Sequence, residues 1–299
     1  MKILVTGSNG FIGSALVSYL AQHGHEVTRL VRQEVEAGGR EVRWDPDAGT
    51  IDESGLAGID AVVHLAGQNI AAGRWTDRRK VQIRDSRVKG TRLLSEALAR
   101  LDPPPRVLVC ATGKDFYGDR GSEVLREDSS SGSGFLADVT QQMEAASEPA
   151  SRAGVCVVNL RLGLVLRPTG GALKRMLPVF KLGLGGKLGR GNQYWPWISM
   201  DDLLGTIDHV LATQSLEGAV NTCAPSVPTN AEFTKALGRA LSRPTLFFVP
   251  PLTLRILFGE VSEALLSGQR MDSSKLQASG FEFHHTDLQA ALCDMLGRA

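Results

Sequence analysis

The sequence predicts a doubly wound α/β fold built on a parallel sheet. Short runs rich in Val, Ile and Leu alternate with segments of helical periodicity, and the first run ends in a glycine-rich turn. Strands that read as nearly continuous apolar runs are typical of a parallel sheet covered by helices on both faces. The apolar runs cover residues 3–5, 26–31, 61–65, 106–110 and 155–160.

Three helices are predicted between these strands, at 14–23, 78–99 and 135–153. An amphipathic helix repeats its apolar residues every three or four positions and buries that stripe against the sheet. The second helix shows this spacing most clearly, with Val81, Val88, Leu93, Leu94 and Leu98.

Two loop-like segments interrupt the alternation. Residues 119–134 are rich in Ser, Gly and acidic side chains, and we expect this loop near the carboxyl edge of the sheet, facing a substrate. Residues 169–196 are dense in glycine and carry several Lys and Arg side chains. The second segment either folds over an anionic ligand or is a solvated linker, and the sequence leaves both readings open.

Glycines stand at positions 7, 10 and 13, between the first strand and the first helix. The first permits a tight turn, the second lets backbone N–H groups approach a pyrophosphate, and the third lets the helix pack closely on the strand. The alternative is a glycine-rich turn without a ligand. We predict a dinucleotide cradle made of Gly7, Ser8, Gly10, Phe11, Ile12 and Gly13.

The end of the second strand indicates which dinucleotide binds. NAD sites usually place Asp or Glu there to bind the ribose 2′-hydroxyl, whereas NADP sites use a basic side chain to bind the 2′-phosphate. Here the strand ends in Val31 and Arg32, and the planar guanidinium of Arg32 can hold a phosphate. We therefore predict NADP and include both residues in the site. The alternative is a solvated surface arginine close to Glu34.

Composition narrows the class of protein. The chain has 299 residues, a hydrophobic fraction of 42% and a formal net charge of +1, so nothing electrostatic favours nucleic acid or a membrane surface as a partner. No signal peptide or membrane-spanning stretch is apparent, and the 4 cysteines lack metal-binding spacing. We expect a cytoplasmic protein with reduced thiols and no metal site.

Several motifs resemble an extended short-chain dehydrogenase/reductase of the sugar-nucleotide epimerase type. They are the cradle at 7–13, His64-Leu65-Ala66-Gly67 and Phe116-Tyr117-Gly118. Further motifs are similar to the atypical, epimerase-like subgroup of this family, namely Arg74-Trp75, Ser86-Arg87, Arg161-Leu162-Gly163, Gly170-Gly171-Ala172-Leu173, Trp197-Ile198 and Gly268-Gln269-Arg270. The resemblance implies a Rossmann-type NAD(P)-binding domain over 1–240 and a small, substrate-side domain of unknown function over 245–299.

Cofactor contacts beyond the cradle follow partly from the fold and partly from this resemblance. Leu65, Ala66 and Gly67 come at the carboxyl end of a strand, where their backbone should line the adenosine side of the crevice. The resemblance implies that Gln82 and Arg87 reach toward the cofactor from the next helix. A solvated helix face is the alternative for both, because this segment is crowded with charges.

The usual catalytic pair of the family is absent. Ordinary members use a Tyr, with a Lys four residues later, to transfer the substrate proton. Leu136 and Thr140 stand at these two positions. Leucine carries no proton, so we expect Leu136 to pack against the nicotinamide as a cofactor contact.

The loop after the 106–110 strand supplies the candidate replacements. Thr112, Lys114, Asp115 and Tyr117 follow a central strand at the edge where the nicotinamide should lie. Lysine and carboxylate side chains placed close together shift each other's pKa and can act as acid and base. An ordinary surface ion pair is the alternative.

Isolated histidines are weaker candidates. His64 reads as a hydrogen-bonded core residue rather than a catalyst. His284 and His285 have no Cys or acidic cluster beside them in the sequence, so we interpret them as surface or packing residues.

Two functions of different classes remain. The first is an NADP-dependent oxidoreductase or epimerase acting on a small hydroxyl or carbonyl compound, with a nucleotide sugar as one candidate. The second is a nonenzymatic NADP(H)-binding redox sensor or regulatory protein, which the missing Tyr and Lys favour. We expect a small-molecule partner in either case, and the sequence leaves open whether the chain forms a homodimer.

Overall fold

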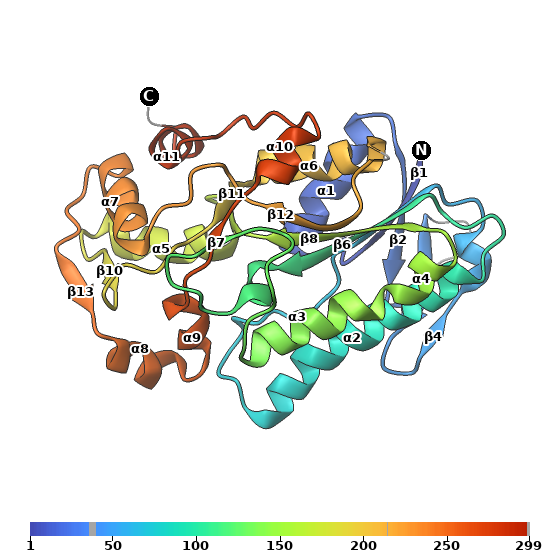
Figure 1. The fold of residues 1–299 in the computed structure, drawn as a ribbon, viewed down its shortest axis with the longest axis horizontal. Helices are drawn as coiled ribbons and strands as arrows, with labels where there is room; N and C mark the ends of the chain where they lie inside the picture. The colour runs from blue at the N-terminus through green and yellow to red at the C-terminus, as the bar shows by residue number, and fades with distance from the viewer. Residues whose placement is uncertain (36–39, 214, 298–299) are drawn as a thin grey trace.

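The computed structural model describes residues 1–35, 40–213 and 215–297. An eight-stranded sheet forms its centre, in the order β12-β8-β6-β5-β1-β2-β3-β4 (Figure 1). Neighbouring strands run parallel except β3 and β4, which are antiparallel. The strands are β1 (Lys2–Thr6), β2 (Glu26–Val31), β3 (Glu41–Asp45), β4 (Thr50–Ile51), β5 (Ala61–His64), β6 (Val107–Gly113), β8 (Cys156–Leu162) and β12 (Gly218–Thr222).

The order of the strands confirms the doubly wound fold. The chain winds outward from β1 through β2 in one direction and from β5 through β6 in the other, so the winding reverses between β1 and β5. In such sheets ligands bind beyond the carboxyl ends of the strands at this reversal. The predicted cradle and the loop after β6 both lie at this edge.

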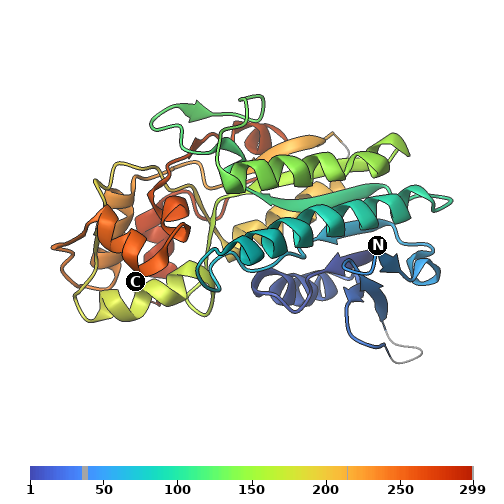
Figure 2. The ribbon, with the colours of Figure 1, turned by 90° about the horizontal axis from the view of Figure 1, so that it is seen from below.

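Helices cover both faces of the sheet. On one face α1 (Phe11–Gln22) packs beside α6 (Met200–Ala212). On the other, α2 (Asp77–Ala99) and α3 (Phe135–Ala146) run side by side, as Figure 2 shows. The helix expected over 135–153 is divided: α3 ends at Ala146, and a separate α4 (Glu148–Arg152) begins with Pro149 in its first turn. Proline lacks a backbone N–H, so it fits the first turn of a helix and favours a new helix start here.

Three strands of the sheet, β3, β4 and β12, were not expected, and β4 has only two residues. β3 has alternating buried and exposed residues rather than a continuous apolar run, and β12 is an outer strand that follows a long helical and loop region. Outer positions of a sheet are covered less completely, so the continuous apolar pattern that marks its central strands is weaker there.

The remaining elements form a lobe beyond the carboxyl edge of the sheet, at the left of Figure 1. The glycine-rich segment 169–196 contributes regular structure to this lobe rather than an unstructured linker. The helices and strands of the lobe are α5 (Gly171–Lys181), α7 (Asn230–Ala240), α8 (Pro251–Phe258), α9 (Val261–Leu266), α11 (Leu288–Met295), β7 (Val124–Leu125), β9 (Leu164–Leu166), β10 (Gly186–Leu188), β11 (Trp197–Ser199), β13 (Phe247–Val249) and β14 (Arg270–Met271). The exception among the remaining elements is α10 (Ser274–Ala278), which packs against β12 of the sheet and lies beside α6 in Figure 1. The short 3₁₀ helices of the chain are η1 (Glu53–Leu56) and η2 (Lys114–Tyr117).

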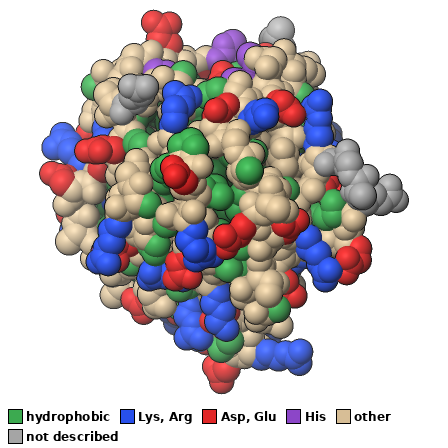
Figure 3. Space-filling model, turned by 90° about the vertical axis from the view of Figure 1, so that its right-hand side faces the viewer, with side chains coloured by type: hydrophobic (Ala, Val, Ile, Leu, Met, Phe, Trp, Pro, Cys, Tyr) green, Lys and Arg blue, Asp and Glu red, His purple; other side chains and the backbone are tan. Residues whose placement is uncertain are grey.

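The surface adds two observations. Over the end of the molecule at the right of Figure 1, Lys and Arg side chains are interspersed with Asp and Glu (Figure 3). That face therefore presents no field of a single sign. Across the described ranges, no helix combines the length and the apolar character that crossing a membrane requires.

Candidate functional site

The glycine-rich turn between β1 and α1 has the geometry that a phosphate cradle needs. Gly7 adopts φ +65°, and a Cβ there would lie 2.8 Å from the backbone carbonyl of Leu65. A Cβ at Gly13 would lie 2.2 Å from the carbonyl oxygen of Gly7. Both contacts exclude a side chain, so these two glycines set the tight turn and the close approach of helix to strand.

Gly10 differs from its two neighbours. It is the N-cap of α1 with extended backbone (φ −78°, ψ 177°), and within the described residues no side chain caps this helix end. A Cβ at Gly10 would contact only the carbonyl oxygen of Gly7, at 3.1 Å. The N–H groups of the first turn therefore have no capping side chain among the described residues, an arrangement that suits an anion.

A short loop covers the cradle from the side of the lobe. A Cβ at Gly170 would lie 2.3 Å from the ring of Phe11, and one at Gly171 would lie 2.9 Å from it. These glycines let the segment before α5 pack directly on Phe11, next to the predicted pyrophosphate position.

A buried polar network holds the backbone behind the cradle. The hydroxyl of Thr6 accepts hydrogen bonds from the N–H groups of Leu65 (3.0 Å) and Ala66 (3.1 Å) and pairs with Nδ1 of His64 at 2.8 Å. The other ring nitrogen of His64 contacts the hydroxyl of Thr91 at 3.1 Å. Burial, with a smaller contribution from the charge of Arg87, lowers the pKa of His64 to about 4. His64 is therefore a neutral core residue, as the sequence indicated.

At the end of β2, Val31 is buried and Arg32 is exposed. The Arg32 side chain is 47% exposed, and its Nη1 lies 4.0 Å from a carboxylate oxygen of Asp47. A contact at this distance between solvated groups restrains the side chain little. The guanidinium is therefore free to meet a phosphate at the adenosine end of the crevice.

The two candidates on α2 differ in their surroundings. Arg87 donates from Nη1 to the carbonyl oxygens of Gln68 (3.0 Å) and Ile83 (3.2 Å), so it fixes the turn after β5. Burial lowers the pKa of Arg87, and the nearby carboxylate of Asp115 opposes that shift. Gln82 is exposed, and its Oε1 lies 3.5 Å from Nη1 of Arg79.

A cavity of about 370 Å³ lies between the loop after β6, the start of α3 and the segment 255–269 of the lobe. Leu136 and Asp115 both line it, so the structure brings the predicted nicotinamide contact and one predicted acid/base residue to the same wall. The residues of the wall are Trp75, Asp115, Gly118, Asp119, Ser133, Gly134, Phe135, Leu136, Ala137, Arg255, Glu263, Ala264, Leu266, Ser267 and Gln269.

Lys114 stands directly behind Asp115. Its Nζ donates to Oε1 of Gln269 at 2.7 Å and lies 3.3 Å from Oδ1 of Asp115, and the two charged side chains are 15% and 21% exposed. Gln269 is fully buried and donates from Nε2 to the carbonyl oxygen of Gly118 at 2.7 Å. The Lys114–Asp115 pair is thus held by a hydrogen bond that reaches across from the lobe, unlike a free surface ion pair.

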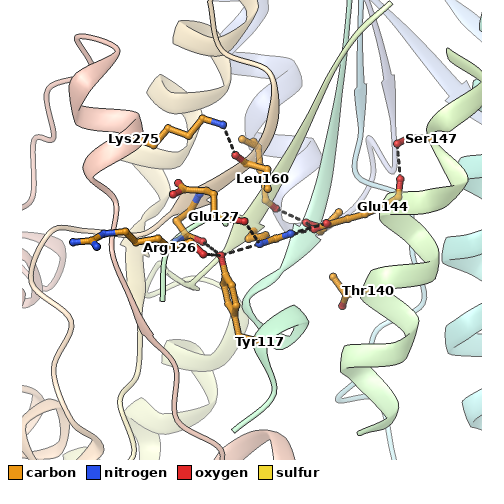
Figure 4. Close-up of polar contacts among 12 residues, drawn as sticks. Tyr117, Arg126, Glu127, Thr140, Glu144, Ser147, Leu160 and Lys275 are labelled. Atoms are coloured by element: carbon orange, nitrogen blue, oxygen red, sulfur yellow. Dashed lines mark hydrogen bonds and ion pairs between the residues drawn. The ribbon is translucent and has the colours of Figure 1, made fainter. Parts of the chain in front are cut away.

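Thr112 and Tyr117 lie elsewhere. The Thr112 hydroxyl contacts the carbonyl oxygen of Leu160 at 3.1 Å and Oε1 of Glu144 at 3.3 Å, on the β8 side of β6. Tyr117 is fully buried, and its hydroxyl lies 2.7 Å from Oδ1 of Asn221 and 2.9 Å from Nη1 of Arg161 (Figure 4). Burial raises the pKa of Tyr117 to about 12. The structure brings neither residue to the cavity wall.

Thr140, at the position expected for a catalytic lysine, is buried and its hydroxyl is already hydrogen-bonded. Thr140 donates its hydroxyl to the carbonyl oxygen of Leu136 at 2.8 Å, within α3. Neither of the two usual catalytic positions on this helix therefore offers a Tyr or Lys side chain for proton transfer.

Sequence reasoning missed several residues of the wall, including Asp119, Arg255, Glu263 and Gln269. Asp119 belongs to the loop that we expected to face a substrate, and Gln269 belongs to a motif that carried the family resemblance, so both had a signal. Arg255 and Glu263 lie in short helices of the lobe, where no local pattern marks them as site residues.

Comparison with known proteins agrees with this geometry. The NAD dependent epimerase/dehydratase family model matches residues 3–222, and a domain of unknown function, DUF1731, matches residues 249–295. The epimerase family protein Mb2239 of Mycobacterium bovis is 43% identical over 291 residues, which are 97% of this chain and 96% of that protein. The human epimerase family protein SDR39U1 is 37% identical over 301 residues, covering 99% of this chain and all of the human one.

Solved structures show the same likeness. The crystal structure of human SDR39U1 (isoform 2) with NADPH has a TM-score of 0.92 and 35% identity, with each chain covered in full. MoeE5 in complex with UDP-glucose and NAD has a TM-score of 0.76 at 22% identity over 99% of this chain and 98% of that one, which indicates a shared fold.

Proposed function

This chain belongs to the NAD dependent epimerase/dehydratase family, and on that premise we propose that it is an NADPH-dependent oxidoreductase or epimerase-like enzyme of small carbonyl or hydroxyl compounds. The human relative was crystallised with NADPH. In this chain the uncapped start of α1 suits the pyrophosphate, and exposed Arg32 suits a 2′-phosphate. The residues we assign to NADPH are Gly7, Ser8, Gly10, Phe11, Ile12, Gly13, Val31, Arg32, Leu65, Ala66, Gly67, Gln82, Arg87 and Leu136.

One observation carries the proposal of an enzyme. The cavity beside Leu136 contains a titratable group, Asp115, at the carboxyl end of β6. A pocket beyond the carboxyl end of a central strand, with a carboxylate and a lysine that a second element holds in place, is the expected place for proton transfer.

The chemistry divides between cofactor and protein. When bound, NADPH supplies the hydride that adds to a carbonyl carbon. Asp115 holds the substrate hydroxyl in the cavity and takes its proton in the direction of oxidation. Lys114 holds Asp115 in position, and in the direction of reduction Asp115 returns the same proton to the substrate oxygen. Gln269 positions Lys114.

Variants at this pair test the assignment. Asp115→Asn and Lys114→Met should each lower NADPH-dependent turnover by about 10²-fold, the scale of a lost general acid or base, with NADPH affinity unchanged. Asp138→Asn, on the exposed side of α3, is the matched control and should leave turnover unchanged. Wild-type rates in both pair variants, measured by NADPH absorbance, would remove the proposed acid/base role.

The redox sensor is the second candidate. It is favoured by Leu136 and Thr140, which leave the two usual catalytic positions without a proton donor. A sensor binds NADPH and never oxidises it, so background rates across a panel of carbonyl compounds would favour this function. Leu136→Tyr with Thr140→Lys should then create carbonyl reductase activity that the wild type lacks, because only the acid/base pair would have been missing.

A further inference from the structure

The cavity that we assign to the substrate is predominantly acidic. Asp115, Asp119 and Glu263 line it, and Arg255 is the one basic side chain among the described residues of its wall. The acidic residues come from two separate parts of the chain, the loop after β6 and helix α9, so the fold gathers them at one place.

Cations behind the wall offset part of this charge. Lys114 lies 3.3 Å from Asp115 and thus offsets one carboxylate. Lys80 pairs with Glu260, which precedes α9. Asp119 accepts backbone N–H groups, from Gly268 at 3.1 Å and from Gly121 at 3.4 Å, and these neutral donors hold the carboxylate without removing its charge. Arg87 also acts on Asp115, and Lys80 on Glu263, from behind the wall. Among the side chains that line the cavity itself, three carboxylates still face one guanidinium.

The opposite part of the wall is apolar. Trp75 and Phe135 pack edge to face, with ring centroids 5.3 Å apart, and Leu136 and Leu266 also line the cavity. Apolar and aromatic surface of this kind binds a hydrocarbon portion of a ligand, and aromatic faces also attract cations.

We propose that the substrate of this cavity is an uncharged or cationic carbonyl or hydroxyl compound with an apolar portion and no phosphate or carboxylate group. A nucleotide sugar brings a diphosphate, and proteins hold such groups with Arg, Lys or backbone N–H donors. Here a diphosphate would meet three carboxylates, with Arg255 as the one cationic side chain of the described wall and the uncapped start of α3 as its source of backbone donors. Like charges repel strongly in a partly buried site. This inference rests on the proposed function and replaces the nucleotide sugar as candidate substrate.

Three aldehydes of similar shape test the inference. They are benzaldehyde, 4-trimethylammonio-benzaldehyde and 4-carboxybenzaldehyde, which are neutral, cationic and anionic. With the NADPH-saturated full chain, we expect kcat/KM and affinity by calorimetry to be at least about tenfold lower for the anionic aldehyde than for the cationic one. UDP-glucose should show no measurable binding to the same complex.

Removing the charge of the wall should abolish this selectivity. In the Asp119→Asn/Glu263→Gln double variant, the ratio between the cationic and anionic aldehydes should fall to about one. Both substitutions keep similar size, and the amide oxygen introduced by Asp119→Asn can still accept the N–H of Gly268. Asp138→Asn removes a carboxylate outside the wall and should retain the wild-type ratio, which controls for the general charge of the protein.

These measurements distinguish a failure of the proposed enzyme function from a failure of the proposed charge preference. If no aldehyde is oxidised or reduced, the proposed enzyme function fails, and the calorimetric order of affinities still decides the charge preference. Equal or tighter binding of the anionic aldehyde, binding of UDP-glucose to the wild type, or binding of none of the three aldehydes would each overturn the inference.

Discussion

Arg161 and Glu144 form a two-bonded ion pair between β8 and α3. Nε of Arg161 donates to Oε1 of Glu144 at 2.9 Å, and Nη2 donates to Oε2 at 2.8 Å. The side chains are 5% and 14% exposed, so the pair is largely removed from water. The guanidinium carbon also lies 3.4 Å from the ring centroid of Phe116. The pair therefore fixes the helix that carries Leu136 to the sheet and to the loop after β6.

Glu144→Gln should destabilise the fold strongly. The substitution leaves the Arg161 guanidinium buried without its counter-charge, which typically costs about 3–5 kcal/mol. The free energy of unfolding from urea titrations measures the effect. Glu148→Gln is the control, because Glu148 pairs with Arg152 at the surface (53% and 76% exposed) and such pairs contribute about 1 kcal/mol or less. Similar small losses in both variants would contradict a structural role for the buried pair.

Stability should decrease as the pH falls through the range set by His64. Burial lowers the pKa of His64 to about 4 in the folded protein, against 6.5 for an exposed histidine. The unfolded chain therefore takes up the proton first. The contribution of neutral His64 is present in full above about pH 6.5 and is lost progressively down to about pH 4, a total of roughly 3 kcal/mol.

Unfolding free energies at several pH values, compared between wild type and His64→Asn, isolate this contribution. The variant lacks the titrating ring, so its stability should depend less on pH over the same interval. An imidazole signal of His64 that titrates near pH 6.5 in the native NMR spectrum would contradict the lowered pKa.

Two glycines of the cradle should respond differently to alanine. Gly13→Ala places a Cβ at 2.2 Å from the carbonyl oxygen of Gly7, so the backbone must move, at a cost of about 1–3 kcal/mol in stability. Gly10→Ala meets only that same oxygen at 3.1 Å and should leave the fold intact, while its methyl group hinders the pyrophosphate. Thermal unfolding and NADPH fluorescence titration separate the effects. Full NADPH affinity in folded Gly10→Ala would show that this glycine is not part of a phosphate site.

Arg32 should determine the preference for NADPH over NADH. Loss of a charge-assisted bond to the 2′-phosphate in Arg32→Ala should reduce that preference by about 1.5–3 kcal/mol, roughly 10- to 150-fold in the ratio of dissociation constants. Arg29→Ala, in the same strand and also partly exposed, is the control. Calorimetry that finds equal affinity of the wild type for both cofactors would contradict the assignment.

The sequence by itself predicted the features that depend on neighbours along the chain. The central strands and the cradle at 7–13 were predictable because apolar runs, helical periodicity and glycine spacing all act over a few residues. The absence of Tyr and Lys at Leu136 and Thr140 was also visible, since that motif lies within one helix. β3, β4 and β12 escaped prediction because strands at the outer positions of a sheet lack the continuous apolar run.

The tertiary structure decided which of the candidates share a site. Asp115 faces the cavity, whereas Tyr117, two residues later, is buried against Asn221, more than a hundred residues away in the chain. The sequence shows no Cys or acidic cluster beside His285, yet its Nδ1 lies 3.6 Å from Asp202 and its Nε2 lies 3.1 Å from Asp294. Spacing along the chain cannot reveal such contacts, because the partners come together only in the folded protein. There, each buried polar group needs a hydrogen-bonding partner.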